Sequence, residues 1–300
     1  GLYDKTIIFF YSDHGGPLPR QKRLIYDSGL KVPLIIRFPD AERGGTQDEQ
    51  LVSFVDFAPT TMGLSGLATP EHMHGRDFIQ NSDKEREFIH AAADRFDGFT
   101  DAIRAVKDKR FKYIRNYRPE QGYYLPVAYR ERIPTMQELL RLKEEGRLSE
   151  VQMQWFREKK PREELFDTMN DPHELQNLAA DPKYADTLNK LSAEMDKWLG
   201  DIGDTPNLPE RTLIKMLWQG SSSQPQTIAP QVSFANGLAT IDSESSRASI
   251  GYRIINQESE PLAWSLYLGP ISVPQGAELQ VVAHRIGFIE SATTTHVVTN

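Results

Sequence analysis

The chain has 300 residues, of which 39% are apolar and 26% charged, an ordinary globular composition with room for one large domain or two smaller ones. Its formal charge is −7, from 35 Lys and Arg against 42 Asp and Glu. A nucleic-acid-binding protein usually carries a basic stripe, and this sequence has only short local ones, so we expect no nucleic-acid partner. No apolar run approaches the ~20 residues that cross a bilayer, so we expect no transmembrane segment.

The chain contains no cysteine. This excludes disulfides, thiolate metal ligands and a cysteine nucleophile within these residues, but it does not identify a compartment. Gly1 is not an initiator methionine, and no basic segment followed by an apolar stretch precedes the first expected strand. We therefore expect a fragment or a processed product.

The first elements predict a buried sheet with polar residues at the end of one strand. The apolar run 7–12 is typical of a strand buried on both faces of a parallel sheet, and 32–38 predicts a second strand of that sheet. The first run ends in a glycine-rich turn that begins with Asp13 and His14. Ligand sites in open α/β sheets lie beyond the carboxyl ends of strands, so chemistry is commonly placed here. Residues 51–67 are apolar at helical spacing and predict a core-facing helix.

The middle of the chain predicts an antiparallel sheet followed by helices. Residues 88–93 and 102–106 predict strands, and 110–117 alternates polar and apolar residues, as a half-exposed strand does. We interpret the basic face of 110–117 as a solvated edge strand rather than a nucleic-acid platform. The later patterns predict helical structure over 134–160, a short strand or turn at 164–167, a helix that opens at 171–175, and an amphipathic helix over 184–199.

The last third of the chain predicts a separate module. Residues 200–209 are rich in Gly, Pro and Asp, and residues 219–230 in Ser, Gln and Pro, which are linker compositions. Short strand-like runs with turn residues between them then predict a small β-sandwich. These runs cover 249–255, 262–268 and 278–284. The expected organisation is a first region over 1–200, a linker over 201–230 and a β-sandwich over 231–300.

Asp13 and His14 are candidate metal ligands, because a carboxylate and an imidazole at a strand's end can both reach one divalent cation. The alternative is structural, with Asp13 capping the next turn and His14 packing locally. Arg20, Lys22 and Arg23 follow closely in the sequence. A metal ligand beside clustered cations suits an anionic ester whose charge is neutralised in the transition state.

Several motifs then follow one another in a recognisable order. They begin with Ser-Asp-His-Gly at 12–15, Lys22 before Tyr26, and Lys-Val-Pro-Leu-Ile at 31–35. Together they resemble the C-terminal half of a type I sulfatase, closest to the sulfamidase- and iduronate-sulfatase-like branches. The resemblance covers residues 1–200 and implies the α/β fold of the alkaline phosphatase superfamily, with a mixed sheet and a small antiparallel sheet. Further matching stretches lie at 55–60, 74–78, 112–117, 164–167 and 170–174.

The resemblance implies roles for the residues of this loop. Asp13 and His14 would be two ligands of one active-site divalent cation, usually calcium in this family. Calcium prefers oxygen ligands and some members carry Asn at the second position, so His14 has the alternative of facing the sulfate. Lys22 would hold the sulfate oxygens and offset charge on the transferring sulfuryl group. Arg20 and Arg23 are either substrate contacts or solvated surface cations.

A further group of residues has both a functional and a structural interpretation. In related sulfatases the region of His90, Asp94 and Arg95 borders the substrate pocket, so these residues are candidate substrate contacts. The alternative for them is a structural salt bridge.

The tail resembles the small β-sandwich appended to some hexosaminidases and bacterial sulfatases. Its aromatic residues Tyr252, Trp264 and Tyr267 either stack on sugar rings or form the core of the sandwich.

The sequence departs from the family at one decisive point. Type I sulfatases use a formylglycine made from the Cys or Ser of a Cys/Ser-x-Pro/Ala-x-Arg motif, preceded by a paired Asp-Asp, and neither motif occurs here. The resemblance therefore implies a chain with part of the metal site and the sulfate-binding lysine but no nucleophile. We expect it to be inactive alone and to require the N-terminal half of the same enzyme.

The complete enzyme is expected to hydrolyse a sulfated saccharide, and the family implies a periplasmic or secreted location. One alternative is a non-catalytic module that binds a glycan or an anion. Another is a phosphoryl-transfer relative in the same superfamily. Such phosphatases usually bind two metals through several more His and Asp ligands, so a single metal with Lys22 favours sulfate.

Overall fold

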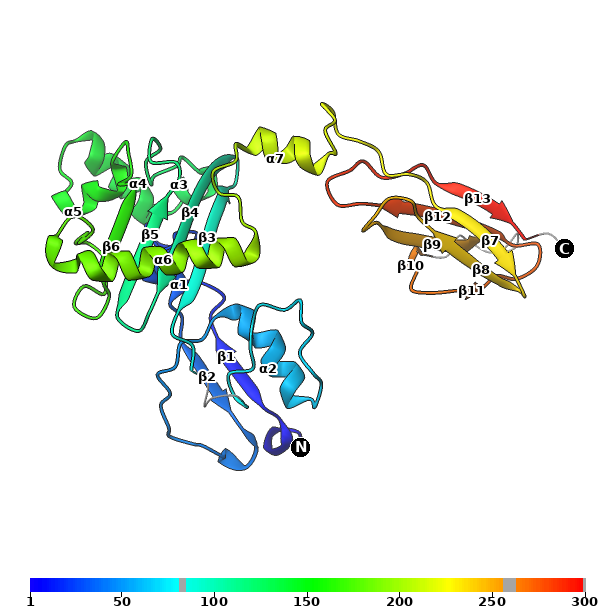
Figure 1. Cartoon of the computed structure of the whole chain (residues 1–300), viewed down its shortest axis with the longest axis horizontal. Coiled ribbons are helices and arrows are strands. Elements are labelled where there is room, and N and C mark those ends of the chain that lie inside the picture. Colours follow the sequence, from blue (N-terminus) through cyan, green and yellow to red (C-terminus); the bar gives the residue numbers. More distant parts are fainter. Residues whose placement is uncertain (81–84, 256–262, 299–300) are drawn as a thin grey trace. The chain divides into compact units, whose positions relative to one another are not determined.

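The computed structural model describes residues 1–80, 85–255 and 263–298. The chain forms two compact units, Gly1–Asn207 and Leu208–Asn300 (Figure 1). The predicted mixed α/β class is confirmed, with small antiparallel sheets in the first unit and two packed sheets in the second. The described helices include none with the length and apolar character of a membrane-spanning segment.

The first sheet consists of β1 (Ile8–Tyr11) and β2 (Leu34–Arg37), which pair antiparallel. The predicted parallel arrangement is therefore wrong. The predicted burial of both faces is also wrong, because Phe10 is 64% exposed and Ile35, directly opposite it, is 60% exposed.

The other face of this sheet is partly covered. Phe57, at the start of α2 (Phe57–Leu64), lies with its ring 6.1 Å from that of Phe9 and 4.9 Å from that of Tyr11. A continuous apolar run in the sequence gives no sign of which face is covered, so it could not predict this one-sided packing.

The second sheet has four antiparallel strands in the order β3-β4-β5-β6. Their bounds are Ile89–Phe96, Phe99–Lys107, Phe111–Asn116 and Glu163–Asp167. Because β5 lies between β4 and β6, the prediction of a half-exposed edge strand at 110–117 is wrong. Two of its cations are covered by ion pairs instead: Lys112 with Asp27 and Glu174, and Arg115 with Asp196.

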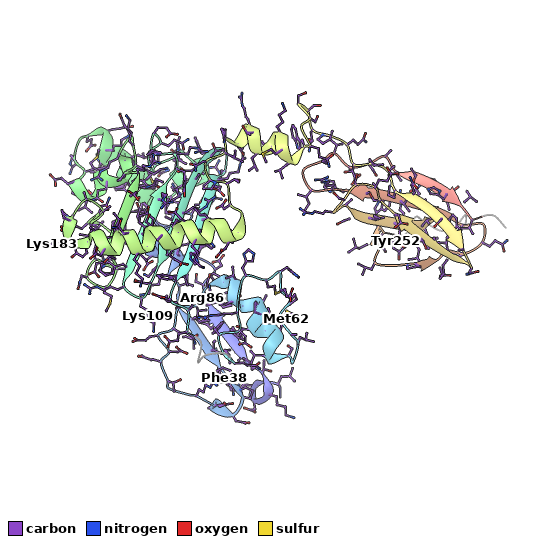
Figure 2. The ribbon with its side chains drawn as sticks, in the orientation of Figure 1. Phe38, Met62, Arg86, Lys109, Lys183 and Tyr252 are labelled. Carbon is purple, nitrogen blue, oxygen red and sulfur yellow. The ribbon has the colours of Figure 1, made fainter. Side chains whose placement is uncertain are left out.

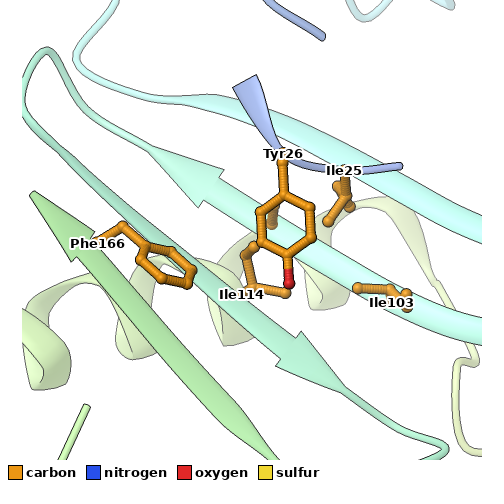
Figure 3. Close-up of a cluster of buried hydrophobic side chains, with 6 residues drawn as sticks. Ile25, Tyr26, Ile103, Ile114 and Phe166 are labelled. Carbon is orange, nitrogen blue, oxygen red and sulfur yellow. The ribbon is translucent and has the colours of Figure 1, made fainter. Parts of the chain in front are cut away.

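The two faces of this sheet are covered by different parts of the chain. Helix α6 (Ala185–Ile202), which runs along one face in Figure 1, contributes Leu191 and Met195 to a core with Tyr113 and Leu165. The opposite face packs against Ile25 and Tyr26, which come from the segment between β1 and β2. Figure 3 shows this second cluster, which also contains Ile103, Ile114 and Phe166.

The remaining helices are short, and one predicted helix does not form. Residues 171–175 make a turn in which Glu174 has φ +53°. The Asp171 carboxylate accepts hydrogen bonds from the backbone N–H groups of Leu175 and Gln176, at 2.7 and 2.8 Å. This side-chain bonding replaces the helical pattern. The other described α-helices are α1 (Asp27–Leu30), α3 (Ala128–Glu131), α4 (Pro134–Glu144), α5 (Glu150–Met153) and α7 (Glu210–Leu217).

The second unit is a sandwich of two antiparallel sheets. One has the order β10-β9-β12-β13, with bounds Ser265–Leu266, Ser249–Ile255, Glu278–His284 and Thr294–Val297. The other has the order β11-β8-β7, with bounds Ile271–Ser272, Leu238–Asp242 and Gln231–Ala235. The predicted strands 249–255 and 278–284 are confirmed, and residue 262 of the third lies outside the described residues. Residues from both sheets, including Ile241, Leu279 and Val281, form one buried core.

Candidate functional site

The loop between β1 and β2 carries Asp13, His14 and Lys22, and its backbone folds back on itself. The Gly15 N–H donates to the Gly29 carbonyl at 2.9 Å, and the Lys22 N–H donates to the Gly16 carbonyl at 3.1 Å. The loop therefore returns Lys22 to the turn that begins with the Asp-His pair.

Two glycines make this folded loop possible. A Cβ on Gly15 would lie 1.9 Å from the carbonyl oxygen of Ser28, and a Cβ on Gly29 would lie 2.4 Å from the carbonyl oxygens of Gln21 and Leu24. Any side chain at either position would force backbone segments apart. The glycine requirement is thus steric and follows from the close approach of the two ends of the loop.

Asp13 and His14 present two ligand atoms side by side. Asp13 Oδ2 lies 3.4 Å from His14 Nε2, and the Asp13 side chain is 81% exposed. His14 Nδ1 lies 2.6 Å from the Gly15 carbonyl oxygen, which only accepts hydrogen bonds, so Nδ1 is the donor and Nε2 is the ring nitrogen available to a metal ion. Two lone-pair atoms at this separation fit a shared cation with ligand distances of about 2.0–2.6 Å.

Asp13 and His14 alone do not make up a complete metal site. Within the described ranges no group of three or more His, Asp and Glu residues is placed to hold a metal ion. Calcium takes six to eight oxygen ligands, so Asp13 and His14 would supply a minority of its shell.

Among the residues that the structure describes, Lys22 differs from Arg23 in having no carboxylate partner. Its side chain is half-buried, with Nζ 6.0 Å from the centre of the Tyr129 ring. Across residues 1–80, 85–255 and 263–298, no carboxylate forms an ion pair with Lys22. Arg23, in contrast, is ion-paired with Asp97. A half-buried ammonium group without a carboxylate is suited to an anion supplied by a ligand.

Arg20 holds the loop to the rest of the unit. Its guanidinium donates to the carbonyl oxygens of His173 at 2.5 Å and Glu174 at 2.6 Å, and its carbon lies 3.9 Å above the centre of the Tyr26 ring. These contacts give Arg20 a structural role, and its predicted substrate contact stays a prediction.

A network of buried charged side chains holds the same loop against the four-stranded sheet. Lys112 Nζ lies 2.5 Å from Asp27 Oδ1 and 2.8 Å from Glu174 Oε1, while the Asp27 N–H donates to Glu174 Oε2 at 2.5 Å. Lys107 forms an ion pair with the second oxygen of Asp27. Burial raises the pKa of Asp27, but Lys112 and Lys107 outweigh it and the pKa lies below its usual value. Burial also raises the pKa of Glu174, although Lys112 opposes the shift.

Residue patterns alone gave no role to this network. Lys112 lies in the matching stretch 112–117 and Glu174 in 170–174, so the family motifs marked two of its members. Asp27 and Lys107 lie 80 residues apart and were missed, because only the folded sheet brings them together.

His90 lies on the other side of the sheet. Its Nε2 is 3.1 Å from Glu194 Oε1, and its ring stacks on Trp198 with centres 4.7 Å apart. Burial lowers the pKa of His90, and Glu194 opposes the shift. Both partners belong to α6, so His90 lies on the face opposite Ile25 and Tyr26.

Asp94 and Arg95 do not join the loop site either. Asp94 accepts a hydrogen bond of 2.7 Å from Arg104, which also pairs with Asp204 at 2.6 Å. Arg95 is exposed on β3. The described contacts bring neither residue together with Asp13, His14 or Lys22, and their substrate roles stay predictions.

A cavity of about 520 Å³ lies near the end of α6, away from the predicted site residues. Much of the charge that lines it is already compensated. Arg115 pairs with Asp196 at 2.5 Å, and Asp204 pairs with Arg104. Lys22, in contrast, has no carboxylate partner among the described residues. The loop that carries Lys22 is therefore the better candidate for a binding site than this cavity.

Comparison with known proteins identifies the family of this chain. Residues 20–154 match the family model described as N-sulphoglucosamine sulphohydrolase, C-terminal. The chain is 60% identical over 292 residues to an ulvan-active sulfatase of Formosa agariphila, with 96% of this chain and 49% of that protein covered. The chain belongs to the sulfatase family.

More distant sulfatases match a smaller part of the chain. The N-sulphoglucosamine sulphohydrolase of Homo sapiens is 26% identical over 227 residues, covering 68% of this chain and 43% of that protein. A solved 2-O GAG sulfatase aligns with a TM-score of 0.48 at 23% identity, covering 67% of this chain and 37% of that chain. The chain spans less than half the length of both curated relatives.

Proposed function

We propose that this chain is the C-terminal part of a sulfatase that hydrolyses a sulfuric ester of a saccharide. The observation that carries the proposal is the folded loop, which combines paired Asp13 and His14 ligand atoms with a half-buried Lys22 that has no carboxylate partner among the described residues. Family membership supports the same chemistry.

Lys22 acts on the sulfuryl group. Sulfate oxygens carry negative charge, and a fixed ammonium group at their position stabilises charge that redistributes during transfer. Its site is pre-organised because Arg20 and the Lys112 network hold the loop on the sheet. Lys22 therefore needs little rearrangement when substrate binds.

Asp13 and His14 would hold one divalent cation, which we propose to be calcium. The Nδ1 proton of His14 is fixed on the Gly15 carbonyl, so Nε2 faces the Asp13 carboxylate as an acceptor. When bound, the cation would supply Lewis-acid charge to the reaction. The remaining ligands come from outside the residues described.

The nucleophile also comes from outside these residues. Neither cysteine nor a Ser-x-Pro/Ala-x-Arg motif occurs in the 300 residues. We propose that a segment preceding this region in the complete protein supplies a formylglycine. The chain spans 49% of the relative it matches at 60% identity, which leaves room for such a segment.

The experiment compares sulfate release by the complete protein with release by the isolated 300-residue chain. Ulvan is the first substrate to test, because the relative at 60% identity is ulvan-active. We expect the complete protein to release sulfate and the isolated chain to release none. Release by the isolated chain would refute the missing nucleophile, and a complete protein that cleaves a phosphorylated saccharide but no sulfated one would favour the phosphoryl-transfer alternative.

A further inference from the structure

The aromatic residues of the β-sandwich unit lie on different faces of one of its sheets. Tyr252, labelled in Figure 2, and Tyr267 are half-buried and pack against the buried core, and the Tyr267 hydroxyl accepts a hydrogen bond of 3.1 Å from the Ile241 N–H. Trp264 lies outside that core with 42% of its surface exposed. Single exposed apolar side chains are common on protein surfaces, so the groups around Trp264 decide whether it belongs to a binding site.

Trp264 rests against the outer face of the sheet at a glycine. A Cβ on Gly251 would lie 3.5 Å from a carbon of the indole ring and 3.3 Å from a methyl carbon of Val282. The missing side chain at Gly251 thus leaves the space in which the ring packs on β9. The ring is supported from the sheet side and keeps an exposed surface for a ligand.

Arg253 places a cation beside this ring. Its guanidinium carbon lies 4.7 Å from the centre of the Trp264 ring, and its Nε donates to Gln280 Oε1 at 2.8 Å. In the part of the chain that the structure describes, no carboxylate forms an ion pair with Arg253. The guanidinium is held in place by these contacts and keeps N–H donors for an anion.

The strand register continues this row of polar groups across the sheet. Arg253 pairs with Gln280, and Gln280 pairs with Thr295, so the three side chains share the outer face. Thr295 is exposed. Leu266, 60% exposed, pairs with Gly251 and adds an apolar neighbour.

We propose that this outer face, made by Trp264, Arg253, Gln280 and Thr295, is a binding site for an anionic saccharide. The apolar C–H face of a sugar ring packs on the indole, and a sulfate or carboxylate on the sugar accepts hydrogen bonds from Arg253. The Gln280 amide and the Thr295 hydroxyl bond to sugar hydroxyls. The site goes beyond the proposed catalysis, because it binds the polymer without reacting with it.

The chemistry of the face favours a saccharide over a protein partner. Protein interfaces usually bury about 800 Å² per partner around an apolar centre. Here Trp264 and Leu266 form one apolar group beside the polar row, while the exposed Val297 and Glu278 lie beyond Thr295 and Gln280 on the same face. That pattern of one planar apolar group with a few polar groups is suited to a single sugar unit with its charged substituent.

Binding to the 300-residue chain is measured by isothermal titration with ulvan, chemically desulfated ulvan and neutral dextran. We expect the wild-type chain to bind ulvan and to bind the desulfated form at least fivefold more weakly. Trp264→Ala should weaken binding about tenfold or more, and Arg253→Gln should remove the preference for the sulfated form. The matched control is Phe234→Ala, on β7 of the other sheet, whose ring is 42% exposed.

Wild-type affinity in both Trp264→Ala and Arg253→Gln would overturn the proposal, and so would an equal loss in Phe234→Ala. Far-UV circular dichroism of each variant identifies any that fails to fold, and Arg253→Gln then decides the question alone. The titration requires no turnover, so absent binding with normal sulfate release would refute this site and leave the proposed function standing. Normal binding with no sulfate release by the complete protein would refute the proposed function and leave this binding site standing.

Discussion

Lys112→Met tests the charge network that holds the Lys22 loop on the sheet. Lys112 is 2% exposed, and its Nζ lies 2.5 Å from Asp27, 2.8 Å from Glu174 and 3.1 Å from the Ile25 carbonyl oxygen. Methionine nearly fills the same volume, so the substitution removes charge without opening a large cavity. It leaves two carboxylates close together with Lys107 as their remaining cation.

Removing one partner from a buried ion pair costs about 3–5 kcal/mol, because the other charge remains without compensation. The control is Arg141→Met, whose side chain is 48% exposed and pairs with Glu138 at 2.6 Å and Glu145 at 2.5 Å. Exposed pairs of this kind contribute about 0–1 kcal/mol. The two variants therefore differ by several kcal/mol although each removes one cation with two acidic partners.

The assay is urea unfolding of the chain followed by tryptophan fluorescence. Trp218→Phe and Trp264→Phe form the background, so that the signal comes from Trp155 and Trp198 in the first unit. With a slope of about 2 kcal/mol per molar urea, Lys112→Met should lower the midpoint by about 2 M. A midpoint shift as small as that of Arg141→Met would refute the reasoning.

Other substitutions test the loop and the network separately. Gly15→Ala should destabilise the first unit and loosen the loop, because its Cβ would lie 1.9 Å from a carbonyl oxygen. The matched variant Gly200→Ala lies in α6, and its Cβ would meet nothing within 4 Å. Gly200→Ala should therefore raise the free energy of unfolding by about 0.5–1 kcal/mol, as measured by thermal unfolding. The pKa of Asp27 in the folded chain lies below 3.8. The stability that ionised Asp27 contributes is therefore present above pH 3.8 and is lost as the pH falls through the folded pKa. Asp27→Asn should remove this contribution to the pH dependence of the unfolding free energy. An equal acid dependence in Asp27→Asn, or equal stability of the two glycine variants, would contradict these expectations.

The sequence predicted two strands of the β-sandwich from their local pattern. Strands 249–255 and 278–284 alternate clearly, and their observed bounds coincide with the predicted ones. The alternation of 110–117 was equally clear, yet β5 is an interior strand with Tyr113 and Ile114 fully buried. Alternation shows that two faces differ, but it cannot show that an ion pair from another segment covers the polar one.

The sequence also predicted roles for residues of one loop, and those roles stay predictions. The motif order placed Asp13, His14 and Lys22 on one loop, and the folded backbone brings that loop together. The groups that hold it, Asp27 and Glu174, are 147 residues apart and carry no joint signal in the sequence. The one-sided covering of β1 likewise depends on packing that a local apolar run does not encode.

The central claim is that Lys22 binds the sulfate that is transferred. The direct measurement is kcat/KM for sulfate release by the complete protein carrying Lys22→Ala, with Lys31→Ala, an exposed lysine that follows α1, as the matched control. Loss of one charge-stabilising donor should lower kcat/KM by about 100- to 1,000-fold in Lys22→Ala and leave the control near wild type. An unchanged kcat/KM in Lys22→Ala would remove Lys22 from the active site and contradict the account.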